Sequence, residues 1–110
     1  MRFTKKGNIY RIIRLTSSQD NIFGVSFGED NKVEILEWPI EESEKIRTSK
    51  KEVLEQIISG LESVNQSLGT NYKLSKIYFL PSDRASNSVY NLLICKLIRH
   101  YHSGNEFKEV

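Results

Sequence analysis

The fold is decided by residues 49–80, SKKEVLEQIISGLESVNQSLGTNYKLSKIYFL, which predict one helix followed by one strand. Ser49 and Glu52 have the spacing of a capping box, so we expect the helix to begin there. Gly69 is expected to end it, and residues 74–80 predict a short strand. Between these signals, apolar residues recur every three or four positions and form one helical stripe: Val53, Leu54, Ile57, Ile58, Leu61, Val64 and Leu68.

The chain before this stretch predicts three strands. Residues 8–16 and 22–27 are rich in β-branched and aromatic side chains, and residues 32–38 form a third such run. Turn-forming residues from Gly28 onward separate the second run from the third, so we expect these two strands to pair as a hairpin. Pro39 ends the third run because proline cannot donate to a strand ladder. The expected result is a three-stranded antiparallel meander.

The chain after the helix–strand unit predicts a second helix over residues 89–101, capped by Ser86 or Asn87. This helix is apolar around much of its circumference and should be largely buried. Gly104 and the charged tail are expected to end the fold. The predicted class is α+β, in the order β-β-β-α-β-α, with one domain over residues 1–110 and both helices packed on one sheet face.

The other sheet face is expected to be partly free, and its composition is unusual. Ile9 and Ile13 lie on one side of the first predicted strand, whereas Tyr10 and Ile12 lie on the other. Because both sides carry apolar side chains, neither face is plainly solvated. A second layer or a partner is therefore expected on the open face.

Composition favours a globular protein of the cytoplasm. The chain has 110 residues, of which 38% are hydrophobic and 27% charged, which suits one modest core. Its single cysteine, Cys95, lies in an apolar run and is expected to be a core residue in a reducing compartment. The first residues are interrupted by Arg11 and Arg14, unlike a signal peptide, and no membrane span is expected.

Catalytic patterns are weak. The order of elements suggests part of a ribonuclease H-like fold, but Asp83 is an isolated carboxylate and is more simply a turn residue. His100 and His102 are two apart on a helix, which separates their directions, so neither is expected to bind metal. No phosphate loop, nucleophile elbow or Cys/His pattern occurs. We therefore expect no enzyme activity, cofactor or metal.

Charge is segregated along the chain, which favours a binding function. Residues 1–14 carry five bases and no acid, whereas residues 15–44 carry eight acids and one base. Fields of opposite sign steer encounters with charged partners. Trp38 amid glutamates could anchor a basic protein surface, or it could be a core residue beside a solvated edge. The candidate partner-binding residues are Glu34, Glu37, Trp38, Glu41, Glu42 and Glu44.

An alternative function uses the basic N-terminal segment to bind nucleic acid, as a small binding or regulatory domain. Its candidate residues are Arg2, Lys5, Lys6, Arg11 and Arg14. The same bases could equally form a solvated strand face, and the neighbouring acids would repel phosphate.

Residues 76–93, KIYFLPSDRASNSVYNLL, form a strand, a Pro-Ser-Asp turn and a helix start. This pattern resembles one found in bacterial contact-dependent growth inhibition (CDI) immunity proteins. The resemblance implies a small cytoplasmic protein that binds and neutralises one cognate toxin domain, often a nuclease. It carries over no catalytic residue, and from charge alone we expect a basic toxin to meet the acidic segment.

Overall fold

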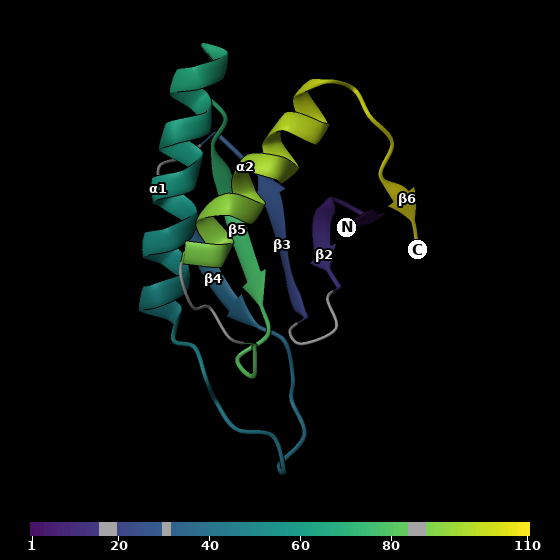
Figure 1. Ribbon diagram of the computed structural model, residues 1–110, viewed down its shortest axis with the longest axis vertical. Coiled ribbons are helices and arrows are strands. Elements are labelled where there is room, and N and C mark those ends of the chain that lie inside the picture. Colours follow the sequence, from purple (N-terminus) through teal and green to yellow (C-terminus); the bar gives the residue numbers. More distant parts are fainter. Residues whose placement is uncertain (16–19, 30–31, 84–87) are drawn as a thin grey trace.

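The computed structural model describes residues 1–15, 20–29, 32–83 and 88–110, which contain six strands and two helices (Figure 1). The chain is of the α+β class, with one mixed sheet and both helices on one face of it. In chain order, the elements are β1 (Arg2–Lys6), β2 (Ile9–Arg14), β3 (Asn21–Phe27), β4 (Glu34–Glu37), α1 (Lys50–Leu68), β5 (Leu74–Phe79), α2 (Val89–His102) and β6 (Lys108–Glu109).

Helix α1 has the predicted limits. The N–H of Glu52 donates to the Ser49 hydroxyl at 3.3 Å, and Gly69 ends the helix with φ 68°. The glycine is needed here because a left-handed backbone is costly for residues with a side chain. The predicted helical stripe is confirmed at Val53, Ile57, Leu61 and Val64, which are buried, whereas its members Leu54, Ile58 and Leu68 are only half-buried.

Helix α2 is also confirmed, although its outer side is more exposed to solvent than expected. Leu92, for example, is 51% exposed. The proposed caps Ser86 and Asn87 lie outside the described residues. The residue before the helix is Ser88, whose side chain makes no capping bond. Instead, Gln56 of α1 accepts a 3.0 Å bond from the N–H of Tyr90, so one helix supplies an acceptor to the start of the other.

The sheet order is β4-β5-β3-β2-β1-β6, which corrects the predicted meander. The third predicted strand does not form a hairpin with the second, because β5 lies between them and β4 pairs with β5 in parallel. The physical reason is burial. Ile77 and Phe79 of β5 are fully buried and need neighbours on both sides, whereas Glu34 and Glu37 of β4 suit an edge.

Two further strands were not predicted. Strand β1 pairs with β2 through a tight turn in which Gly7 has φ 60°, and its charged sequence conceals its strand character. Gly104 and the charged tail were expected to end the fold without a further strand predicted there, but β6 pairs with β1 in parallel. The Phe107 ring holds this tail by edge contacts with Phe3 and Tyr10, at 5.8 and 5.0 Å between centroids.

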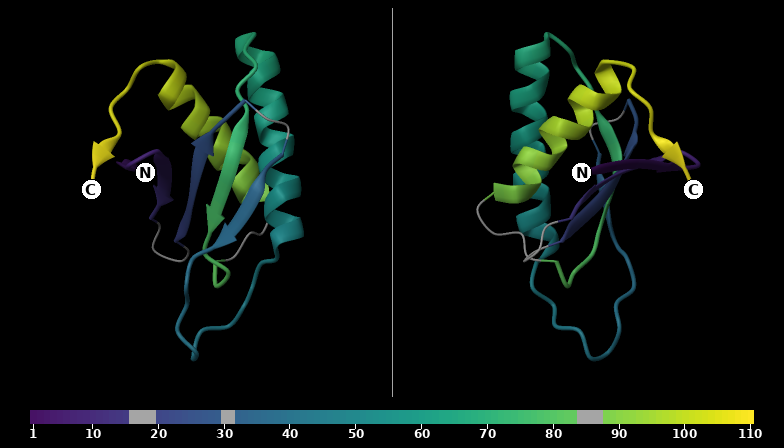
Figure 2. Two further views of the ribbon diagram at one scale, coloured as in Figure 1. Left: turned by 180° about the vertical axis from the view of Figure 1, so that it is seen from behind. Right: turned by 45° about the vertical axis from the view of Figure 1, so that its right-hand side comes forward.

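One face of the sheet carries the core and the other carries no helix (Figure 2, left). Ile12, Phe23 and Val25 are fully buried beneath the helices. The register therefore places alternate residues on the open face, which confirms the expectation that Ile9 and Ile13 lie opposite Tyr10 and Ile12. Among the described residues, no helix is long and apolar enough to span a bilayer.

Candidate protein-binding surface along strand β4

The predicted partner-binding residues lie along one end of the sheet. Glu34 and Glu37 are exposed at the two ends of β4, which is the terminal strand on that side. Glu41, Glu42 and Glu44 are exposed on the connection from β4 to α1. This connection extends beyond the sheet, at the lower end of the molecule in Figure 1. We call residues 33–47, together with residues 54–62 of α1, the β4 surface.

Trp38 is neither a core residue nor a free anchor. It lies half-buried on the open sheet face, stacked on Tyr78 with ring centroids 6.0 Å apart and planes 19° apart. Gly24 makes room for it, because a Cβ at that position would lie 3.4 Å from the indole and 2.9 Å from Ile9. The indole is thus held flat against the sheet, with part of its surface available to a partner.

The β4–α1 connection presents an apolar residue that the sequence analysis missed. Ile46 is 74% exposed between charged neighbours. Its position is held by backbone bonds, since the N–H groups of Arg47 and Thr48 both donate to the carbonyl of Pro81, at 2.8 and 3.1 Å. An isolated isoleucine within a charged run is the sequence signal that could have identified it. Such an exposed side chain on an anchored segment can insert into a partner.

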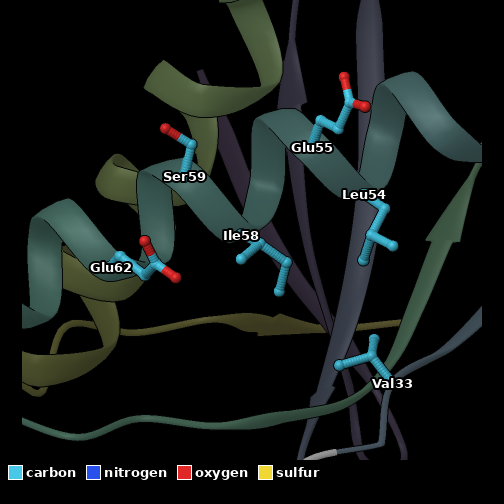
Figure 3. Close-up of a pocket in the computed structure, with 6 residues that line it drawn as sticks. All are labelled: Val33, Leu54, Glu55, Ile58, Ser59 and Glu62. Atoms are coloured by element: carbon cyan, nitrogen blue, oxygen red, sulfur yellow. The ribbon is translucent and has the colours of Figure 1, made fainter.

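A groove of about 570 Å³ runs between α1 and the residue that precedes β4. Figure 3 shows Leu54 and Ile58 pointing from α1 toward Val33, whereas Glu55 points away from Val33. The described lining residues include the carboxylates of Glu55 and Glu62 and no basic side chain. The groove extends the acidic character of β4 onto the helix. Sequence reasoning missed it because Leu54 and Ile58 were assigned to the buried stripe.

The five basic residues of the alternative hypothesis are divided between the two faces. The register places Arg2, Lys6 and Arg11 on the open face, where the Arg11 Nε donates to the Thr4 hydroxyl at 3.1 Å. Lys5 lies on the helix side, with its ammonium 4.9 Å from the centre of the Tyr10 ring. Arg14 shares the parity of Ile12 and is also on the helix side. The open face therefore holds three of the five bases.

Asp83 has a structural position. Its carboxylate is buried and accepts from the N–H of Ile22 at 2.8 Å and from the Tyr90 hydroxyl at 3.3 Å. It thereby joins the turn after β5 to the start of β3 and to α2. Burial raises the pKa of this carboxyl, partly offset by the hydrogen bonds from Ile22 and Tyr90. Burial also raises the pKa of Tyr90, as does the neighbouring carboxylate.

The remaining candidate groups have ordinary partners. His100 stacks on Phe3 at 3.7 Å and its Nε2 lies 2.7 Å from the carbonyl of Glu106. The Nδ1 of His102 lies 2.8 Å from the Tyr72 hydroxyl. Cys95 is half-buried and donates to the carbonyl of Gly60, and burial raises the pKa of its thiol. Across the described residues, no group of three or more His, Cys, Asp and Glu could hold a metal ion.

Comparison of the chain with protein-family models, with curated proteins and with solved structures finds no match.

Proposed function

We propose that this chain is an immunity protein that binds a cognate bacterial toxin domain in the cytoplasm and neutralises it. The observation that carries the proposal is the β4 surface. Exposed glutamates, the half-buried Trp38 and the exposed Ile46 all belong to residues 33–47, and an apolar groove lies between Val33 and α1. Interfaces of this composition combine charge steering with a few apolar or aromatic anchors.

Five glutamates outnumber Lys45 and Arg47 within residues 33–47, so the charge of the surface favours a basic partner, such as a nuclease domain. A nuclease that binds a polyanion commonly presents a basic cleft, and an acidic protein surface can occupy that cleft. Neutralisation then requires only tight binding over the substrate path. No catalytic group of this chain takes part.

The test uses the toxin fragment encoded by the reading frame directly upstream, expressed together with this chain. We expect the wild-type chain to restore growth and to co-purify with the toxin. Combined Glu37→Lys, Glu41→Lys and Glu42→Lys substitutions should abolish both effects, because they reverse the charge of the β4 surface.

A control reverses Glu106 and Glu109, two exposed acids away from the surface. Glu106 precedes β6 and Glu109 belongs to it, and β6 is the edge strand opposite to β4. The control chain should neutralise like wild type. Equal neutralisation by both variants would exclude the β4 surface, and failure of the wild-type chain would exclude this toxin as its target.

A second candidate function is binding of single-stranded nucleic acid. It is favoured by one observation: Arg2, Lys6 and Arg11 share the open sheet face with the stacked Trp38–Tyr78 pair. Nucleotide bases stack on exposed aromatic rings, while nearby basic side chains contact the phosphates. A labelled oligonucleotide should then bind at low salt. It should lose affinity when Arg2, Lys6 and Arg11 are replaced by alanine, but not when Lys5 and Lys96 are. Absence of binding at low salt would remove this candidate.

A further inference from the structure

Strand β4 has unpaired backbone groups along its outer edge. The N–H of Trp38 donates to the carbonyl of Phe79 at 2.8 Å, so Trp38 directs its backbone toward β5. Successive residues of a strand alternate in direction, which turns the N–H and C=O groups of Ile35 and Glu37 outward. In the described part of the chain, no strand pairs with this edge.

The groove lies beside this same edge. A strand added to β4 would lie about 4.8 Å from it. Alternate side chains of the added strand would then point toward α1, where Leu54 and Ile58 form an apolar wall opposite Val33. Every second residue of the ligand could therefore be apolar and bury itself against α1. The residues between them would point to the open sheet side.

The charges around the edge determine whether a positively or a negatively charged ligand is favoured. Glu34 and Glu37 are exposed on β4 and Glu55 and Glu62 line the groove, so four carboxylates outnumber the two exposed bases beside them, Lys32 before β4 and Lys76 opposite Glu34. We propose that the edge of β4 binds an extended, basic segment of the partner protein, which pairs with Ile35 and Glu37 as an additional strand and places alternate apolar side chains in the groove. This inference rests on the proposed function, since it states how the toxin is held.

A second copy of this chain is a poorer occupant of the edge. Two β4 strands side by side would bring the glutamates of one copy close to those of the other. Like charges at short distance across a ladder are destabilising. Charges on an edge strand commonly prevent such self-pairing, and here they leave the edge open to a ligand of opposite sign.

The binding test uses a synthetic peptide of about eight residues that alternates lysine and valine, with both termini capped. A peptide that alternates glutamate and valine is the control for charge. Trp38, the only tryptophan, follows β4 directly and reports binding by its fluorescence. We expect the lysine peptide to bind, the glutamate peptide not to bind, and amide hydrogen exchange at Ile35 and Glu37 to slow by roughly tenfold or more in the complex.

Two substitutions at one position separate the contribution of the backbone N–H to peptide affinity from the contribution of the carboxylate charge. Glu37→Ala removes the carboxylate but keeps the outward N–H, whereas Glu37→Pro removes both. Because that N–H is not part of the β4–β5 ladder, proline should leave the sheet intact, which circular dichroism can verify. We expect the alanine variant to bind a few-fold more weakly than wild type, and the proline variant roughly tenfold more weakly than alanine.

Four outcomes of the peptide experiments would overturn the proposal: no binding of the lysine peptide, binding without protection of Ile35 and Glu37, equal affinity of the two variants, or protection without peptide that rises with protein concentration. The last result would assign the edge to a second copy. The toxin assay is independent of these outcomes. A Glu37→Pro chain that still neutralises the toxin as well as Glu37→Ala would leave the proposed function standing and overturn strand addition alone.

Discussion

Asp83 illustrates at the scale of one residue how the same side chain can resemble a catalytic group in sequence and be structural in the fold. Its position after β5 suggested a lone metal ligand, but its carboxylate is occupied by the N–H of Ile22 and the hydroxyl of Tyr90. Removing the acceptor leaves a buried N–H without a partner. We expect Asp83→Ala to lower the free energy of unfolding by about 1–3 kcal/mol, measured by urea denaturation.

Asp83 also predicts a dependence of stability on pH. Burial raises its pKa in the folded protein above the ordinary value of 3.8, so the folded state binds this proton more tightly than the unfolded chain. Its contribution to stability therefore falls as pH rises from 3.8 through the raised pKa. Asp83→Asn keeps an oxygen acceptor and cannot ionise. The free energy of unfolding of wild type minus that of the variant should decrease across this window, and a constant difference would contradict the assignment.

At the scale of elements, the contact between the two helices depends on Gly60. This residue lies buried in α1, and a Cβ there would overlap the Ile94 side chain and the carbonyl of Asn91 in α2. We expect Gly60→Ala to destabilise the protein by about 1–3 kcal/mol in urea unfolding, because overpacking outweighs the gain of roughly 1 kcal/mol in helix propensity. Ser63→Ala, at an exposed position on the same helix, should leave stability unchanged or slightly higher.

The order of the strands is also decided at this scale. The segments that become β2, β3, β4 and β5 were predicted as strands, mainly from their apolar, β-branched and aromatic residues, and residues 22–27 also from alternation. The order of these strands in the sheet was not predicted correctly, since periodicity carries no information on which strand lies beside which. Strand β5 lies between β3 and β4 in the sheet. Its parallel pairing with β4 requires the chain to cross over through α1. Strand β6 depends on the Phe107 ring reaching an aromatic cluster formed by distant parts of the chain.

On the scale of the whole molecule, the segregation of charge along the chain becomes a separation in space. The basic N-terminal residues lie on β1 and β2, whereas the acids of β4 and the following connection lie across β5 and β3 from them. We expect the association rate with a basic toxin to fall as salt rises, with a smaller salt dependence after reversal of Glu37, Glu41 and Glu42. Stopped-flow measurement of Trp38 fluorescence at two salt concentrations tests this, and identical salt slopes would refute steering by this surface.

What the sequence by itself determined are the features set by neighbours along the chain. The limits of α1 follow from Ser49 and Gly69, its buried side follows from the helical repeat, and the identity of the acidic segment follows from composition. Local sterics and periodicity are sufficient for these. Only the tertiary structure decided that β4 is an edge, that Trp38 lies on Gly24 and Tyr78, and that the half-buried Leu54 and Ile58 line a groove. Each of these depends on contacts between residues far apart in sequence, because burial is a property of the packed chain as a whole.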